Sequence, residues 1–190
     1  RTKVIDVFKG MIDVAARFGA MVNIGRSRGF VEDGERVDDA TARFCDVARE
    51  VAAYAQPRDV QLILEPVNRY EINFINSVAE GAALMNAVGV SNMGLMPDLF
   101  HMNIEDPALG PELEMHAEHV RYVHVADSNR RAPGQGHTDF DSVFSSLERM
   151  GFDGWVSVEI LPKPDPDTAA RQAIAFLDRY RSAQPATTTT

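Results

Sequence analysis

The chain lacks several features that would place it in a class at once. It has a single cysteine, Cys45, so no disulfide can form within it, and a reducing compartment is expected. Lys and Arg number 19 against 28 Asp and Glu, a net charge of −9, which argues against nucleic-acid binding because that needs clustered basic residues. No apolar run reaches the roughly 18 residues of a membrane span, and no signal peptide is recognisable. We therefore expect a soluble, cytoplasmic protein with neither a nucleic acid nor a membrane as partner.

The residues that are present alternate between two hydrophobic periods. The 190 residues are 45% hydrophobic, which is enough for one core. Short apolar runs predict five strands, at residues 21–25, 60–64, 93–97, 121–125 and 155–160. Helical spacing predicts six helices, at residues 4–18, 37–55, 77–89, 111–120, 141–151 and 166–181. A long loop is expected between residues 97 and 111. Such alternation is typical of a parallel sheet joined by right-handed crossovers.

Local signals fix some boundaries of these elements. Ser77 and Glu80 form a predicted capping box, and Asp141 is predicted to cap the helix that follows it. Asp165 followed by proline predicts the start of the last helix. Trp155 begins the fifth strand and is predicted to pack between the sheet and its helices.

Four side chains that suit a metal lie at the ends of predicted strands. They are Glu65, Asp98, His124 and Glu159, each about one strand–helix unit of roughly 30 residues from the next. In a parallel barrel, consecutive strand ends converge on one face of the molecule. Three carboxylates and one imidazole meeting there would make a divalent-metal site of mixed oxygen and nitrogen donors. In an open sheet the same loops would spread apart, so this set favours a closed barrel.

The predicted fold is therefore an α/β (β/α)8 barrel, of which this sequence supplies about five C-terminal units. A barrel has eight strands, and about three N-terminal units are expected to be missing from the sequence. We expect one barrel domain over residues 1–182 and a disordered polar tail over residues 183–190, where the sequence is polar and aperiodic.

The strand-end segments also carry a family resemblance. They read EPVNRYE from Glu65, PDLFHMNIED from Pro97, HVADSNR from His124, and VEI around Glu159. These segments resemble the xylose isomerase-like TIM-barrel sugar isomerases and epimerases, and above all the D-tagatose/D-allulose (ketose) 3-epimerases. The resemblance covers the chain except its tail. The first two segments are the specific ones.

The resemblance implies a set of roles. Glu65, Asp98, His124 and Glu159 would hold one divalent ion, manganese (Mn²⁺), Co²⁺ or Mg²⁺, because hard oxygen donors with one imidazole suit such ions. Glu65 and Glu159 would also be the catalytic acid/base pair. Glu71, His101 and Arg130 would bind the oxygens of a small-molecule keto sugar, with Arg130 favoured over its neighbour Arg131. The implied reaction is C3 epimerisation of a free ketose through an enediolate, in an enzyme that is a homo-oligomer (dimer or tetramer) when full length.

Other functions stay open at this point. A hydroxypyruvate isomerase, or an inosose isomerase or dehydratase, would share the metal set on the same barrel. Glu71 favours the epimerase, because it belongs to a motif that extends beyond the metal ligands. A repair endonuclease fits poorly, because it would need more ligands and a basic face. A non-catalytic barrel fragment with two open sheet edges is the alternative from a different class.

Overall fold

The computed structural model describes residues 1–181, and the predicted domain end at 182 and the tail 183–190 lie outside them. The strands are β1 (Val22–Asn23), β2 (Leu62–Leu64), β3 (Met93–Leu95), β4 (Tyr122–Val125) and β5 (Trp155–Val158). The helices are α1 (Thr2–Phe18), α2 (Val37–Ala55), α3 (Val78–Val88), α4 (Leu99–Glu105), α5 (Leu109–Met115), α6 (Phe140–Arg149) and α7 (Pro166–Arg181), with short 3-10 turns η1 (Gly25–Arg28) and η2 (Gln56–Arg58).

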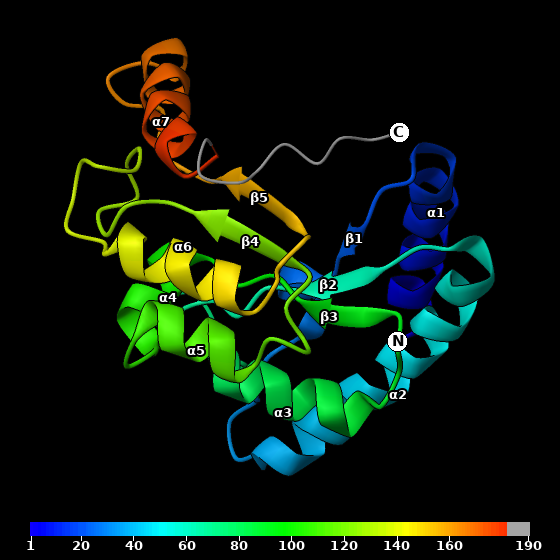
Figure 1. Ribbon diagram of the computed structural model, residues 1–190. Coiled ribbons are helices and arrows are strands. Elements are labelled where there is room, and N and C mark those ends of the chain that lie inside the picture. The colour runs from blue at the N-terminus through cyan, green and yellow to red at the C-terminus, as the bar shows by residue number, and fades with distance from the viewer. Residues whose placement is uncertain (182–190) are drawn as a thin grey trace.

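The five strands are parallel and follow one another in chain order. Regular pairing joins β1 to β2, β2 to β3, and β4 to β5. Parallel bridges Leu95–Val120 and Asp98–His124 connect β3 to β4, so the strand ends are linked from one side to the other. The strands curve together with the helices outside them (Figure 1). This is part of a TIM barrel, as predicted.

The helices pack on the outer face of the strands through the predicted apolar stripes. In α1 the buried positions are Ile5, Phe8, Ile12 and Ala15, which face the core at helical spacing. The helix ends where Gly19 takes a left-handed conformation with φ 61°. The core continues through fully buried strand residues such as Leu62, Leu95 and Val123. The strand ends are therefore held by a closely packed interior.

Three boundary predictions were wrong. The predicted loop contains α4, whose first turn is capped by Asp98 accepting from the Phe100 N–H at 2.8 Å. The helix predicted to run to residue 120 ends at Met115, and Asp139, not Asp141, caps α6 by accepting from the Ser142 N–H. The Ser77 cap is confirmed, although the Glu80 carboxylate bonds to the N–H of Asn76.

Two edges of the sheet lie open among residues 1–181, because β1 pairs only with β2 and β5 only with β4. Trp155 lies on β5 and is 69% exposed, so its predicted packing against the outer helices is wrong.

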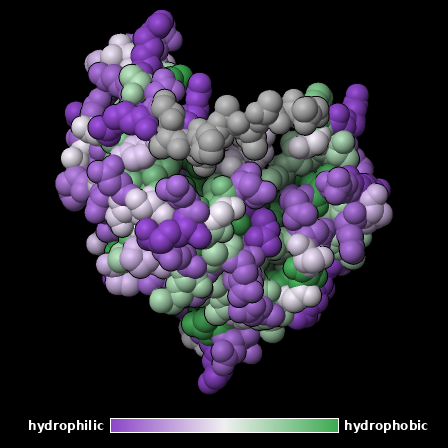
Figure 2. All heavy atoms as spheres, viewed as in Figure 1, coloured by the Kyte–Doolittle hydropathy of each residue, from purple (hydrophilic) through white to green (hydrophobic). Residues whose placement is uncertain are grey.

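Apolar residues of α1 are exposed near β1, among them Val7 and Phe18. Hydrophobic residues show between hydrophilic ones on the face in Figure 2. No helix in the part that the structure describes is long and apolar enough to cross a membrane.

Asp106 gives the fold a pH dependence that can be tested. Its Oδ1 accepts from the Val78 N–H at the start of α3, while its buried Oδ2 has no hydrogen-bond partner. Burial raises the pKa of Asp106 to about 7. A raised pKa favours the protonated form on folding, so this contribution to stability is full below about pH 4 and is lost as the pH rises through 7. An asparagine at position 106 would keep an oxygen that accepts from the Val78 N–H, but it would have no ionisable group.

We expect Asp106→Asn to gain stability relative to the wild-type chain between pH 4 and 7, as measured by urea unfolding across that range. Asp165→Asn is the control, because Asp165 caps α7 on the surface and its hydrogen bonds from Thr168 lower its pKa. Its difference from wild type should stay nearly constant over this range, because a lowered carboxyl pKa changes stability only as the pH falls below about 4. A difference for Asp106→Asn that is independent of pH would contradict the assignment.

Candidate metal centre

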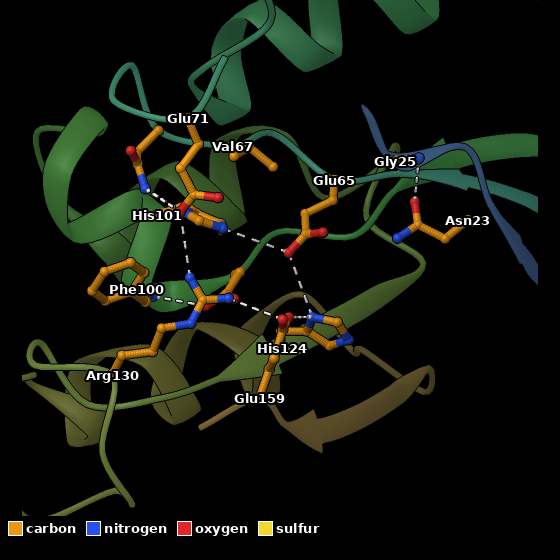
Figure 3. Close-up of polar contacts among 12 residues, drawn as sticks. Asn23, Gly25, Glu65, Val67, Glu71, Phe100, His101, His124, Arg130 and Glu159 are labelled. Carbon is orange, nitrogen blue, oxygen red and sulfur yellow. Dashed lines mark hydrogen bonds and ion pairs between the residues drawn. The ribbon is translucent and has the colours of Figure 1, made fainter. Parts of the chain in front are cut away.

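The four predicted metal residues meet at the carboxyl ends of four consecutive strands. Glu65 follows β2, Asp98 follows β3 as the cap of α4, His124 lies in β4, and Glu159 follows β5. The backbone N–H of Glu159 bonds to the Val125 carbonyl, which extends the sheet to that residue. Figure 3 shows Glu65 and Glu159 reaching His124 from their separate strands.

The donor atoms of this cluster are close enough for one ion. One ligand atom from each residue lies within 4.8 Å of the other three. His124 Nδ1 is 2.8 Å from Glu159 Oε2 and 3.6 Å from Glu65 Oε1. Glu65 Oε1 and Asp98 Oδ2 are buried without a hydrogen-bond partner, while His124 Nδ1 lies against Glu159. Buried polar atoms are normally paired, so two unpaired carboxylate oxygens in this cluster fit a divalent cation.

The charges of the cluster point the same way. Burial raises the pKa of Asp98 to about 7, and the neighbouring carboxylates of Glu65 and Glu159 add to the effect. Burial opposes a charged imidazole, but Glu159 and Glu65 outweigh it and raise the pKa of His124 to about 10. The partner His124 in turn lowers the pKa of Glu159 to about 2. Glu65 and Glu159 therefore favour a proton on His124, where a bound cation would supply the positive charge instead.

The three predicted sugar-binding residues lie beside this cluster. His101 Nε2 is 3.9 Å from Glu65 Oε1, and the ring is 3% exposed. Arg130 donates from Nη2 to Glu159 Oε1 at 2.9 Å, and its Nη1 is 3.6 Å from Glu71 Oε1. The Arg130 guanidinium also lies over the Phe100 ring, 4.7 Å from its centroid. The structure thus gathers all seven predicted residues at one site, and Figure 3 labels all of them except Asp98.

Comparison with known proteins assigns the fold a family. The family model for the xylose isomerase-like TIM barrel matches residues 1–180. The chain belongs to this family. It is 38% identical over 109 residues to a ketose 3-epimerase from Arthrobacter globiformis, which covers 57% of this chain and 38% of that protein. It is 26% identical over 136 residues to a hydroxypyruvate isomerase from Escherichia coli, covering 70% of this chain and 51% of that enzyme.

A solved structure extends the likeness to nearly the whole chain. A D-allulose 3-epimerase from Methylomonas sp. superposes with a TM-score of 0.83 at 25% identity, over 94% of this chain and 70% of the other. The sequence matches above span only about two fifths to one half of the relatives' own length. The relatives support an isomerase or epimerase as the class of enzyme.

Asn68 is a site residue in this xylose isomerase-like barrel that the sequence did not reveal. It is 2% exposed, and its Nδ2 lies 2.7 Å from Nδ1 of His101 and 3.2 Å from Oε1 of Glu71. Its Oδ1 accepts from the Tyr70 N–H, which fixes the amide so that Nδ2 is the donor. His101 Nδ1 must then accept, and burial lowers the pKa of the ring. His101 is therefore neutral and carries its proton on Nε2, the nitrogen that faces Glu65.

Substitution of Asn68 tests whether this residue sets the tautomer of His101. We expect Asn68→Asp to move the proton of His101 to Nδ1, because a carboxylate there accepts where the amide donated. Nitrogen-15 NMR of the ring distinguishes the two tautomers. Asn68→Ala should leave Nδ1 unpaired and lower the free energy of unfolding by about 1–3 kcal/mol. An Nε2-protonated ring in Asn68→Asp would show that Asn68 does not set the tautomer.

The loop that carries Arg130 is shaped by Asp127. This carboxylate is 1% exposed and accepts from the backbone N–H groups of Ser128, Gly134 and Thr138. Asp127 therefore acts as a turn-forming residue. The turn places Arg130 in the left-handed region with φ 59°, which is uncommon for a residue other than glycine. Backbone conformations of this kind are found more often at functional sites, and the Arg130 side chain here donates to Glu159.

Proposed function

We propose that this chain is part of a divalent-metal-dependent epimerase that inverts C3 of a free keto sugar. The observation that carries the proposal is the meeting of two glutamates from different strands, Glu65 and Glu159, at one cluster that contains two unpaired carboxylate oxygens. The residues predicted to bind the sugar, Glu71, His101 and Arg130, lie beside them. The likeness to ketose 3-epimerases supports the same reaction.

The cluster would hold the ion through Glu65, Asp98, His124 and Glu159, with Mn²⁺, Co²⁺ or Mg²⁺ as the proposed ion. When bound, such an ion acts as a Lewis acid that polarises the substrate's carbonyl oxygen. The cluster offers three carboxylates and one imidazole but no thiolate, and such a donor set suits a hard cation. The site residues then have to orient the sugar and move the proton.

The proton transfer is assigned to the two glutamates. Removal of the C3 proton leaves an enediolate, and return of a proton to the opposite face inverts the centre. Glu65 and Glu159 start from β2 and β5, so they approach the cluster from separate strands and would alternate as base and acid. The Nε2–H of His101 and the guanidinium of Arg130 are donors for the oxygens on which charge builds.

Hydroxypyruvate isomerisation is the second candidate, because that match covers a larger share of this chain than the epimerase match. It would use the same cluster to move a proton between neighbouring carbons of a smaller substrate. Glu71 favours the epimerase. It is held by Asn68 and Arg26 at the rim of the site, where a longer sugar would place additional hydroxyl groups.

Product analysis separates these reactions. With Mn²⁺ present, the chain should convert a ketohexose or ketopentose into its C3 epimer, detected by chromatography, and a chelator should stop the conversion. Hydroxypyruvate should remain unchanged. Conversion of hydroxypyruvate to its aldehyde isomer, with every ketose left intact, would replace the proposal by the second candidate.

A further inference from the structure

Arg28 presents a buried charge that the site described above does not use. It ends the turn η1 and is only 5% exposed. Its Nη1 donates to the backbone carbonyl of Glu65, while Nε and Nη2 are buried without a hydrogen-bond partner in the part of the chain described. Burying an incompletely paired guanidinium is costly, so its place beside Glu65 calls for an explanation.

Arg28 lies just beyond the point where the pairing of β1 and β2 ends. Ile24 N–H donates to the Ile63 carbonyl at 2.9 Å, which is the last regular bond between these strands. The chain then leaves the sheet at Gly25, where φ is 52°, and the Gly25 N–H turns back to Oδ1 of Asn23 (Figure 3). A continued strand would have offered a backbone donor to the next carbonyl, that of Glu65. The Arg28 side chain supplies this donor in its place.

The same segment is fastened to the loop after β2 at further points. Arg26 Nη2 donates to Glu71 Oε2 at 2.9 Å. Farther out, Val31 and Asn73 exchange two hydrogen bonds, at 3.1 and 2.8 Å. Of these contacts, only the hydrogen bond from Arg28 is made to a residue of the metal cluster, Glu65. It therefore anchors the end of β2 where the side chain of Glu65 departs.

We propose that Arg28 is a positioning residue, which fixes Glu65 for metal binding and proton transfer by completing the hydrogen bonding at the end of β2. The proposal rests on the role given to Glu65 in the proposed function. Partners that hold a ligand in place are worth about 10–100-fold in metal affinity. The positive charge of Arg28 acts in the other direction, because it repels a divalent cation bound by Glu65. The sign of the effect therefore shows which of the two actions dominates.

The test is a calorimetric titration with Mn²⁺ alone, without sugar. Arg28→Met removes both the donor and the charge, and we expect affinity for Mn²⁺ to fall about 10–100-fold. Arg28→Lys keeps a donor and a charge and should recover most of that loss. Arg26→Met is the matched control, because it removes the same charge from the same turn at an exposed side chain that contacts Glu71. Its affinity for Mn²⁺ should equal that of the wild-type chain.

A second readout separates positioning from general destabilisation. In turnover of a ketose at saturating Mn²⁺, Arg28→Met should lower kcat with KM unchanged, whereas Arg26→Met should raise KM. Unchanged or tighter Mn²⁺ binding by a folded Arg28→Met chain overturns the proposal. If that variant does not fold, Arg28→Lys and Arg28→Gln decide, because the neutral, shorter glutamine must then bind Mn²⁺ more weakly than lysine.

The titration also keeps this inference distinct from the epimerase assignment. A wild-type chain that binds Mn²⁺ but converts no ketose would contradict the proposed reaction, while a weakened Arg28→Met titration would still support the role of Arg28. A wild-type chain that binds no Mn²⁺ would overturn both.

Discussion

Asp98→Asn is expected to weaken Mn²⁺ binding by at least about 100-fold while leaving the metal-free fold intact. Asp98 is completely buried and its Oδ2 has no hydrogen-bond partner, so no contact within the described residues accounts for this oxygen. A bound cation would be its partner. Loss of a direct ligand should exceed the roughly 10–100-fold effect of losing a group that only supports one. Asparagine retains the oxygen that caps α4 through the Phe100 N–H.

The stability of the metal-free variant sharpens this prediction. Burial disfavours the ionised form of Asp98, as its raised pKa of about 7 indicates. Removing that charge should therefore leave the unfolding temperature of the metal-free chain unchanged or higher. Calorimetric Mn²⁺ titration and thermal unfolding measure the two effects. Asp106→Asn is the control, since it removes a buried carboxylate that caps α3 without lining the cluster. Wild-type Mn²⁺ affinity in Asp98→Asn would mean that the ion binds elsewhere.

Glu65→Gln and Glu159→Gln are each expected to lower epimerisation by about 10²–10⁴-fold, the usual contribution of a general acid or base. Because each glutamate serves one face of the sugar, the loss should be asymmetric. Each variant should still exchange the C3 proton of one epimer with solvent through the glutamate that remains. The two variants should differ in which epimer they exchange.

This asymmetry is measured by proton NMR in heavy water at saturating Mn²⁺, starting from each epimer separately. Glutamine keeps a carbonyl oxygen for the ion, so the comparison is made where both variants are loaded. Glu71→Gln is the control: it should raise KM and keep exchange on both epimers. Exchange of the same epimer by both glutamine variants would contradict the division of labour between Glu65 and Glu159.

The sequence predicted the strand ends well because their signals are local. Glu65, Asp98, His124 and Glu159 each follow or interrupt a short apolar run, and parallel strand ends meet at one face whatever the details of packing. Helix α4 was missed because its seven residues are too few to show helical periodicity. It depends on the Asp98 cap and on burial of Leu99 and Met102.

The supporting residues could not be predicted for a different reason. Asn68 and His101 are 33 residues apart, and Arg28 and Glu65 are 37 apart, so only the folded chain pairs them. Arg28 and Asn68 are polar residues in segments that read as loops, where solvent exposure is the usual expectation. Trp155 was assigned to packing because a large aromatic residue at a strand start is usually covered. At β5 no neighbouring strand among residues 1–181 covers it.

Position-specific deuterium uptake tests the central claim most directly. The Mn²⁺-loaded chain is incubated with a ketohexose in heavy water, and each carbon of the recovered sugar is assayed by NMR. We predict deuterium at C3 of both epimers, dependent on the metal and absent in Asp98→Asn. Deuterium confined to C1 or C2 would instead indicate aldose–ketose isomerisation, and no uptake by a metal-loaded chain from any ketose would contradict the account.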